Sequence, residues 1–387
     1  MDRSWLGIGA TIACMVPGLA VRVGVVAVSS PVEAILYGGA VVASAFLLSW
    51  VAEVAQLDMS QGFALALLAL IAVLPEYVVD ASFAWLGGKD PAYTHYAVAN
   101  MTGANRLLIG IAWPMVLAIG FFRFKKREVE LVEGHLVAVA VLLLATLYVF
   151  ILPLKGSLDL LDFVVLILLF AFYMIRVARM PSEEPHLVGP AALIGKMAVG
   201  QRRLVTALLA FLSAGVVLVV AEPFARALVE TGGQMGIDEF LLVQWLAPVA
   251  SEAPEFVVVA IFAWRAMSSE AFSTLVSSKI NQWTLLVGML PLIYMISLGA
   301  AQALPLDARQ SGEIILTAAQ SLFAVSLVID RRLSAQGAAT LLVLFLVQFL
   351  FPMTRHAVTV IYLVLAILVF FRDRNHLVPV LRTLWKR

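Results

Sequence analysis

Two glutamates, Glu76 and Glu255, each follow a proline inside a long apolar stretch of the chain, in Leu74-Pro75-Glu76 and Ala253-Pro254-Glu255. A charged side chain at the centre of a membrane-crossing helix costs about 2.5 to 3.5 kcal/mol, and proline interrupts helical hydrogen bonds. Carboxylates supply hard oxygen atoms, the ligands that Ca²⁺ prefers, and carbonyl groups freed by a proline add further oxygens where they face a cavity. The pattern therefore predicts Glu76 and Glu255 as metal ligands within the membrane.

Further polar side chains lie close to these two glutamates in the sequence and complete a set of oxygen ligands. The predicted ion-binding residues are Glu76, Glu255, Asn100, Asn105, Asn281, Ser251 and Glu252. Each also has a purely structural interpretation, because amides join helices in membranes for about 0.6 kcal/mol each and an embedded glutamate can belong to an ion pair. Asp80 lies one helical turn after Glu76 on the same face, either as a second carboxylate of the site or on the access path to it.

Two basic residues, Lys279 and Arg106, occur in the same apolar surroundings. One interpretation of Lys279 is structural, as an ion pair with Glu252 that offsets the cost of burying both charges. The other is mechanistic: a tethered positive charge at a position where a transported cation would otherwise bind. Arg106, next to Asn105, adds another cation whose role the sequence does not reveal.

The composition places all of these residues in a polytopic, all-α membrane protein. Of 387 residues, 62% are hydrophobic and 13% charged, and the mean hydropathy is +0.99, far outside the range of soluble proteins. The net charge of +1 gives no general attraction to nucleic acid, and a single cysteine, Cys14, excludes an internal disulfide. No phosphate-binding loop, glycine-rich dinucleotide turn or His-Glu-x-x-His motif occurs, so we expect no catalytic residues, no bound cofactor and no enzyme activity.

About twelve apolar segments are long enough, at roughly 20 residues, to cross the bilayer as helices. They span residues 5–28, 31–52, 62–86, 92–122, 131–152, 158–178, 203–229, 239–264, 271–298, 312–329, 335–352 and 356–371. The segment at 92–122 carries several polar residues in its first half, so we expect an irregular helix there.

The basic residues indicate the orientation of these segments. If both termini are cytoplasmic, most of the 26 Lys and Arg residues fall in cytoplasmic loops and in the C-terminal tail. The outer loops then hold Lys89, Lys155, Arg309 and Arg355. This asymmetry follows the positive-inside rule and predicts a multi-pass protein, most simply of the cell membrane, with both termini in the cytoplasm.

The chain divides into two similar halves. A linker rich in proline and charge, residues 179–202, separates a first repeat at 31–178 from a second at 203–352, and Glu76 and Glu255 are 179 residues apart. Five helices separate the starts of the two repeats, so the repeats enter the membrane in opposite directions and are inverted, with broken helices meeting near the midplane. Residues 1–30 and 353–387 add one helix at each end, the latter with a basic cytoplasmic tail.

Three motifs resemble the alpha repeats of the sodium/calcium exchanger superfamily of cation antiporters: Met59-Ser60-Gln61-Gly62, Pro75-Glu76 and Asn100-Met101-Thr102-Gly103-Ala104-Asn105. The resemblance implies a secondary transporter that exchanges Ca²⁺ for Na⁺ or H⁺ by alternating access, with these inorganic cations and the lipid bilayer as its partners. No nucleic-acid partner is expected.

The sequence also departs from the family pattern. Where the family has a hydroxyl pair before each Pro-Glu, the first copy has Ala72 and Val73 and the second has Ser251 and Glu252. Val276 and Lys279 replace a polar residue and a glycine of the pattern. These departures leave open a transporter of another cation on the same scaffold, with Lys279 as a tethered cation, and a membrane protein that does not transport.

Overall fold

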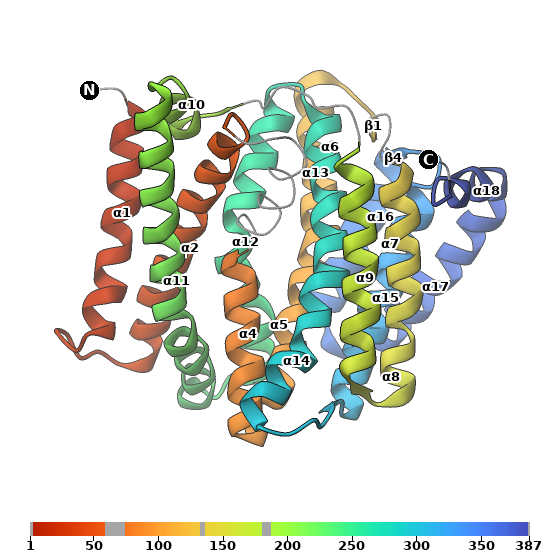
Figure 1. Cartoon of the computed structure of the whole chain (residues 1–387). Coiled ribbons are helices and arrows are strands. Elements are labelled where there is room, and N and C mark those ends of the chain that lie inside the picture. Colours follow the sequence, from red (N-terminus) through yellow and green to blue (C-terminus); the bar gives the residue numbers. More distant parts are fainter. Residues whose placement is uncertain (1–2, 59–73, 132–135, 180–186, 386–387) are drawn as a thin grey trace. The chain divides into compact units, whose positions relative to one another are not determined.

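The computed structural model describes residues 3–58, 74–131, 136–179 and 187–385, and these residues are almost entirely helical (Figure 1). The motif at Met59 to Gly62 and the departures at Ala72 and Val73 lie outside the described residues. The chain forms two compact units, one of Met1–Asn100 and Met174–Glu255, the other of Met101–Tyr173 and Phe256–Arg387. We call them unit 1 and unit 2.

Unit 1 is built from helices that belong to both halves of the sequence. They are α1 (Arg3–Arg22), α2 (Ser30–Ala55), α4 (Leu74–Lys89), the 3₁₀ turn η1 (Pro91–Tyr93), the start of α5 (Thr94–Leu107), the end of α9 (Leu160–Val177), α10 (Pro190–Gly195), α11 (Val199–Met235) and most of α12 (Glu239–Trp264). Helix α2 packs against both α1 and α11, and α4 also contacts α11. Gly18 allows the close approach of α1 to α2, because a Cβ there would lie 2.8 Å from the Leu36 carbonyl oxygen.

Unit 2 contains the remaining helices and four short strands. They are the π-helix η2 (Leu108–Ala112), α6 (Trp113–Phe124), β1 (Glu128–Glu130), α7 (Leu136–Val149), α8 (Ile151–Lys155), β2 (Ser157–Leu158), most of α9, α13 (Ser268–Asn281), the π-helix η3 (Gln282–Leu286), α14 (Val287–Leu298), β3 (Leu304–Pro305), α15 (Ala308–Leu327), β4 (Arg332–Ser334), α16 (Ala335–Leu350), the 3₁₀ turn η4 (Pro352–Thr354), α17 (Arg355–Arg372) and α18 (Arg374–Arg382). Helix α15 packs against α7 and α17, and α16 packs against α6 and η2.

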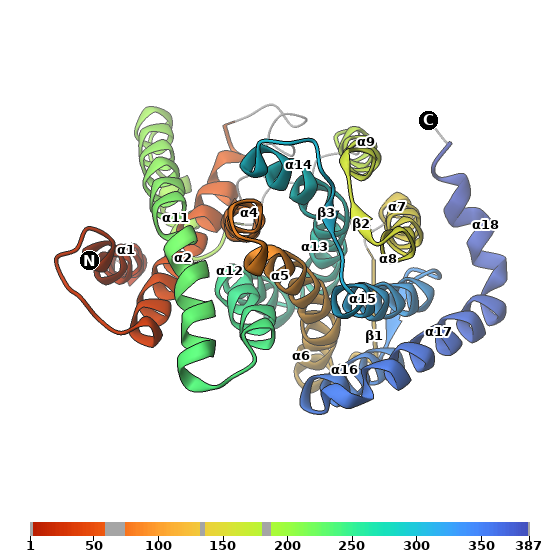
Figure 2. The ribbon, with the colours of Figure 1, turned by 90° about the horizontal axis from the view of Figure 1, so that it is seen from below.

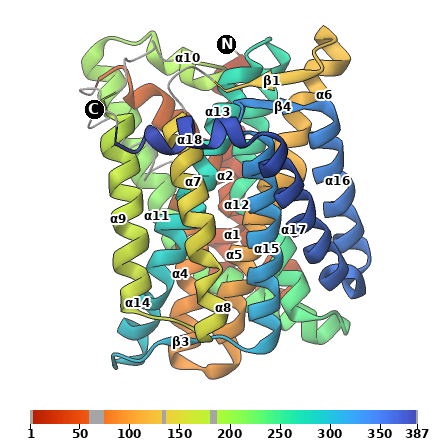
Figure 3. The same cartoon turned by 90° about the vertical axis from the view of Figure 1, so that its right-hand side faces the viewer.

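The strands tie together loops that are far apart in the sequence of unit 2. Strand β1 pairs antiparallel with β4 at one end of the unit, and β2 pairs antiparallel with β3 at the other (Figures 2 and 3). The charge pattern assigns β1 and β4 to one side of the membrane and β2 and β3 to the opposite side. Each pair therefore joins two loops that the sequence places on the same side.

Two stretches of the chain have the same succession of elements. Helix α5, the π-helix η2 and α6 have the same lengths as α13, η3 and α14, and each element begins 174 residues before its counterpart. A π-helix inserts one extra residue into a helical turn and often occurs at functional sites. The irregular helix expected at 92–122 is thus a continuous helix interrupted by a π-turn, and the segment at 271–298 has the same interruption.

Eight of the described helices are long and apolar enough to cross a membrane, and a bent pair within α12 makes a ninth. The pair is bent by 55° between Glu239–Ala253 and Glu255–Trp264, so α12 changes direction at the second Pro-Glu motif, as expected for a proline within a span. The other predicted segments correspond to α4, which is described from Leu74 onward, and to α15 and α16.

Candidate functional site

Glu76 lies on α4, two residues after Leu74, where the described part of the helix begins. The Glu76 side chain is only 4% exposed. A buried carboxylate is costly unless it is paired, hydrogen-bonded or bound to a cation.

Ser251, Glu252 and Glu255 lie on α12 beside its bend, in the same unit as Glu76. The Ser251 hydroxyl donates to the backbone carbonyl oxygens of Ala247, at 3.2 Å, and Pro248, at 3.3 Å. Its own oxygen keeps its lone pairs and remains able to bind a cation. Glu252 is buried, and Glu255 follows the bend in a partly buried position.

Asp80 and Asn100 form a buried pair in unit 1 that the sequence did not predict. The Asn100 Nδ2 donates to Asp80 Oδ1 at 2.6 Å, and both side chains are fully buried. Asp80 Oδ2 and Asn100 Oδ1 are also buried, and neither has a hydrogen-bond partner among the described residues. Buried acceptor oxygens without donors are costly, so this pair offers two oxygen atoms that a bound cation or water would satisfy.

Unit 1 thus contains most of the predicted oxygen ligands, together with Asp80. These residues are Glu76, Asp80, Asn100, Ser251, Glu252 and Glu255. No group of three His, Cys, Asp or Glu side chains within the described ranges is arranged to hold a metal ion.

The other predicted residues, Asn105, Asn281 and Lys279, belong to unit 2. The ammonium group of Lys279 donates to Asn105 Oδ1 and, at 3.3 Å, to the Asn105 carbonyl oxygen. It also lies 4.3 Å from the centre of the Trp283 ring, where a cation–π interaction adds to its stabilisation. Lys279 is fully buried. The Asn105 amide oxygen therefore binds a positively charged group that belongs to the protein.

The matching elements change the predicted correspondence between the two halves. The sequence motifs align Asn105 with Asn281, but the offset of 174 residues between α5 and α13 makes Lys279 the counterpart of Asn105. Asn281 is instead the last residue of α13 and the counterpart of Leu107. Glu252, the predicted partner of Lys279 in an ion pair, belongs to unit 1.

Arg106 has an ion-pair network that the sequence analysis missed. Its guanidinium lies 2.6 Å from the carboxylate of Glu313 on α15 and donates to Gln348 on α16 at 2.9 Å. Glu313 also pairs with Arg355 at the start of α17. The sequence did contain a signal for this network. Arg106 lies in the middle of an apolar segment, and a buried arginine requires an acidic partner.

Comparisons with known proteins agree with this architecture. The sequence model of a family described as "Sodium/calcium exchanger protein" matches residues 32–178 and 205–354. Among solved structures, one described as the crystal structure of the H⁺/Ca²⁺ exchanger CAX is 43% identical, with a TM-score of 0.95, and covers 99% of this chain and 98% of that chain.

Two more distant structures share the fold alone. Native YfkE is 16% identical with a TM-score of 0.64 and covers 88% of this chain and 98% of that chain. The sodium-calcium exchanger NCX_Mj is 14% identical with a TM-score of 0.55 and covers 83% of this chain and 98% of that chain. No curated protein sequence matches the chain. The family match spans most of the chain, so this protein belongs to the sodium/calcium exchanger family of cation antiporters.

Proposed function

We propose that this protein exchanges Ca²⁺ for protons by alternating access, with Na⁺ as the other counter-ion to be tested. The observation that carries the choice of ions is the 43% identity, over 99% of this chain, to a structure described as an H⁺/Ca²⁺ exchanger. The buried oxygen-rich side chains of unit 1 support it, because Ca²⁺ takes carboxylate, amide and hydroxyl oxygens as ligands.

The proposed ligands in unit 1 have distinct roles. Glu76 and Glu255 would bind the cation directly, each beside a proline, with Glu252 as a further carboxylate. Asn100 and Ser251 would add neutral oxygens, since Asn100 Oδ1 has no donor among the described residues and Ser251 uses only its hydrogen atom. Asn105 and Asn281 remain predicted ligands that lie in unit 2, and Asn105 Oδ1 could bind a transported cation only when Lys279 has moved away from it.

Lys279 would act in unit 2 as a tethered cation. It occupies the position that corresponds to Asn105 and places its ammonium group on the Asn105 amide oxygen. An oxygen that accepts from an ammonium group is not available to a transported ion at the same time. We therefore expect fewer cations to be carried per cycle than if an amide stood at position 279.

The experiment that tests the transport proposal is Ca²⁺ uptake into proteoliposomes of the purified full-length protein, under an imposed proton gradient and, separately, a sodium gradient. We expect uptake with the proton gradient, and its loss in Glu76→Gln and Glu255→Gln. Glu222→Gln is the matched control, because Glu222 pairs with Arg226 at the exposed surface of α11 in the same unit. Uptake driven by sodium alone would reject the proton as the counter-ion.

The absence of Ca²⁺ flux under either gradient would reject the calcium proposal. The second candidate, transport of another cation on the same scaffold, would then be favoured. The observation that supports it is Lys279, which alters the second copy of the repeated motif. Uptake of other divalent cations and of Na⁺ in the same vesicles, again compared with Glu76→Gln, would identify that cation.

A further inference from the structure

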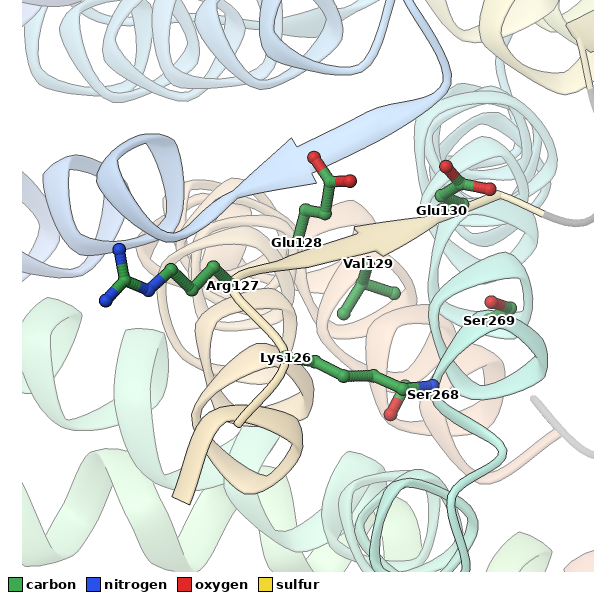
Figure 4. A pocket seen from close by; sticks show the side chains of 7 residues that line it. All are labelled: Lys126, Arg127, Glu128, Val129, Glu130, Ser268 and Ser269. Carbon is green, nitrogen blue, oxygen red and sulfur yellow. The ribbon is translucent and has the colours of Figure 1, made fainter. Parts of the chain in front are cut away.

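A pocket of about 300 Å³ lies in unit 2 where β1 runs beside the start of α13 (Figure 4). It is lined by residues 126–130 and by Ser268 and Ser269. None of these residues is among the predicted ion ligands. Any ligand of this pocket would therefore bind apart from the proposed cation ligands.

The first feature of the pocket is a helix start without a cap. Met267 is the N-cap residue of α13 and makes no side-chain capping bond. The N–H of Ala271 donates to the Met267 carbonyl oxygen at 3.1 Å and makes the first hydrogen bond of this turn. The earlier N–H groups, from Ser268 to Glu270, have no acceptor among the described residues, and such groups attract anions.

The second feature is the hydroxyl of Ser268. Ser268 is only 2% exposed, and its Oγ is buried without a hydrogen-bond partner among the described residues. Figure 4 shows Ser268 and Lys126 among the side chains that line the pocket. Gly120 lies close to this hydroxyl, since a Cβ at that position would be in ordinary contact with Ser268 Oγ at 3.4 Å. A buried hydroxyl without a partner indicates a ligand with acceptor oxygens.

The third feature is the charge that remains after the ion pairs are counted. Glu128 and Glu130 both pair with Arg332, at 3.4 and 2.9 Å. Lys126 and Arg127 also line the pocket, and in the described part of the chain neither has an acidic partner. The three basic side chains Lys126, Arg127 and Arg332 outnumber the two carboxylates of Glu128 and Glu130 by one charge. This net positive charge, together with hydrogen-bond donors, is the combination that a phosphate group requires.

Neighbouring side chains indicate that this end of unit 2 lies at a membrane surface. Phe122, near the end of α6, is 75% exposed and Trp264, at the end of α12, is 57% exposed. The Arg123 guanidinium lies 4.2 Å from the centre of the Trp264 ring. Exposed aromatic rings beside basic residues are typical of the boundary between lipid and water.

We propose that this pocket binds a phosphate group at the membrane surface, held by the Lys126 ammonium, the Ser268 hydroxyl and the first N–H groups of α13. Lipid headgroups and soluble phosphate share this chemistry. The location beside exposed aromatic rings brings the phosphates of anionic lipids within reach of the basic loop. Because the pocket shares no residue with the proposed cation ligands, binding does not depend on transport.

The test measures binding to the purified full-length protein in detergent. Native mass spectrometry follows short-chain phosphatidic acid, and isothermal titration calorimetry follows inorganic phosphate. We expect saturable binding that Lys126→Gln weakens about five- to tenfold, as for the loss of one basic contact at a membrane surface. Ser268→Ala should weaken it as well. Lys125→Gln is the matched control, because it removes the same charge from the same loop but does not line the pocket.

Binding of phosphatidic acid alone would identify a lipid headgroup as the ligand, and binding of both probes would identify phosphate from either source. Both results support the proposal when Lys126→Gln and Ser268→Ala weaken binding and Lys125→Gln does not. Equal weakening by Lys126→Gln and Lys125→Gln would overturn it, since that is general attraction to a basic loop. The absence of saturable binding to well-folded protein would overturn it too, with folding judged from the melting temperature of each variant.

Discussion

At the scale of single residues, the second copy of the motif has Lys279 at the position that corresponds to Asn105 in the first. Lys279→Asn would place the amide of the first copy at the corresponding position and free the oxygen of Asn105. We expect the variant to carry more positive charge per cycle, because a mobile cation replaces the fixed one. The reversal potential of Ca²⁺ flux in proteoliposomes measures this ratio.

Lys196→Asn, which replaces a lysine on the linker of unit 1, serves as the control for Lys279→Asn. A reversal potential equal to that of the wild type in a stable Lys279→Asn protein would contradict the role of tethered cation. It would instead indicate that the lysine only joins α13 to α5.

A separate prediction concerns Asp80 as a cation ligand. Its Oδ2 is buried and has no hydrogen-bond partner in the described structure. Asp80→Asn keeps the size of the side chain and an oxygen for the bond from Asn100, but removes the charge. If Asp80 contributes to cation binding, the Ca²⁺ concentration at half-maximal uptake should rise about tenfold, the equivalent of roughly 1.4 kcal/mol. An unchanged half-maximal concentration with a lower melting temperature would assign Asp80 a structural role.

At the scale of elements, the Arg106–Glu313–Arg355 network joins α5, α15 and α17 inside unit 2. Glu313→Gln would leave two arginines without their shared acid. Removing one partner of a buried ion pair costs about 3 to 5 kcal/mol, so we expect a large fall in the melting temperature of the purified protein. Glu128→Gln is the control, since the exposed pair of Glu128 with Arg332 should contribute at most about 1 kcal/mol. A similarly small effect of both substitutions would contradict a stabilising role for the network.

A second contact between elements is sensitive to pH. Asp58, just after α2, accepts two hydrogen bonds of 2.7 Å from Arg202, in the first turn of α11. The hydrogen bond from Arg202 is the main cause that holds the pKa of the Asp58 carboxyl below its usual 3.8. A carboxyl whose pKa is lower in the folded state stabilises the fold above the unfolded pKa, and this contribution is lost as the pH falls through the folded pKa.

We therefore expect Asp58→Asn to lower the melting temperature at pH 7. The difference from the wild type should shrink as the pH falls below about 3.8, where the wild-type carboxyl also becomes neutral. Melting curves of both proteins across this range provide the measurement. A difference that does not change with pH would indicate that the charge of Asp58 is not responsible.

At the scale of the whole molecule, the paired loops of unit 2 lead to a prediction of sidedness. The charge pattern places the β1–β4 pair in the cytoplasm and the β2–β3 pair outside. In a Cys14→Ser background, Ala301→Cys should react with a membrane-impermeant thiol reagent in intact cells, and Arg127→Cys only after permeabilisation. Both positions are exposed in the structure. Labelling of Arg127→Cys in intact cells would reverse the predicted orientation.

The sequence by itself determined the class of the protein, the approximate limits of its helices and the family to which it belongs. These properties depend on composition, on runs of apolar residues and on short motifs, each of which is local along the chain. The predicted segment at 239–264 has the same limits as α12, and its bend lies at the proline of the second motif. The likeness between the halves was also visible, although with Asn105 matched to Asn281.

Only the tertiary structure decided which charged and polar side chains are partners. The sequence suggested Glu252 as a partner of Lys279 and did not predict that the Lys279 ammonium donates to the Asn105 oxygen. The structure also pairs Asp80 with Asn100 and Arg106 with Glu313, which the sequence could not predict. The physical reason is that a buried polar group is stabilised by whichever partner packing brings within hydrogen-bond distance, and that partner is often more than a hundred residues away in the chain.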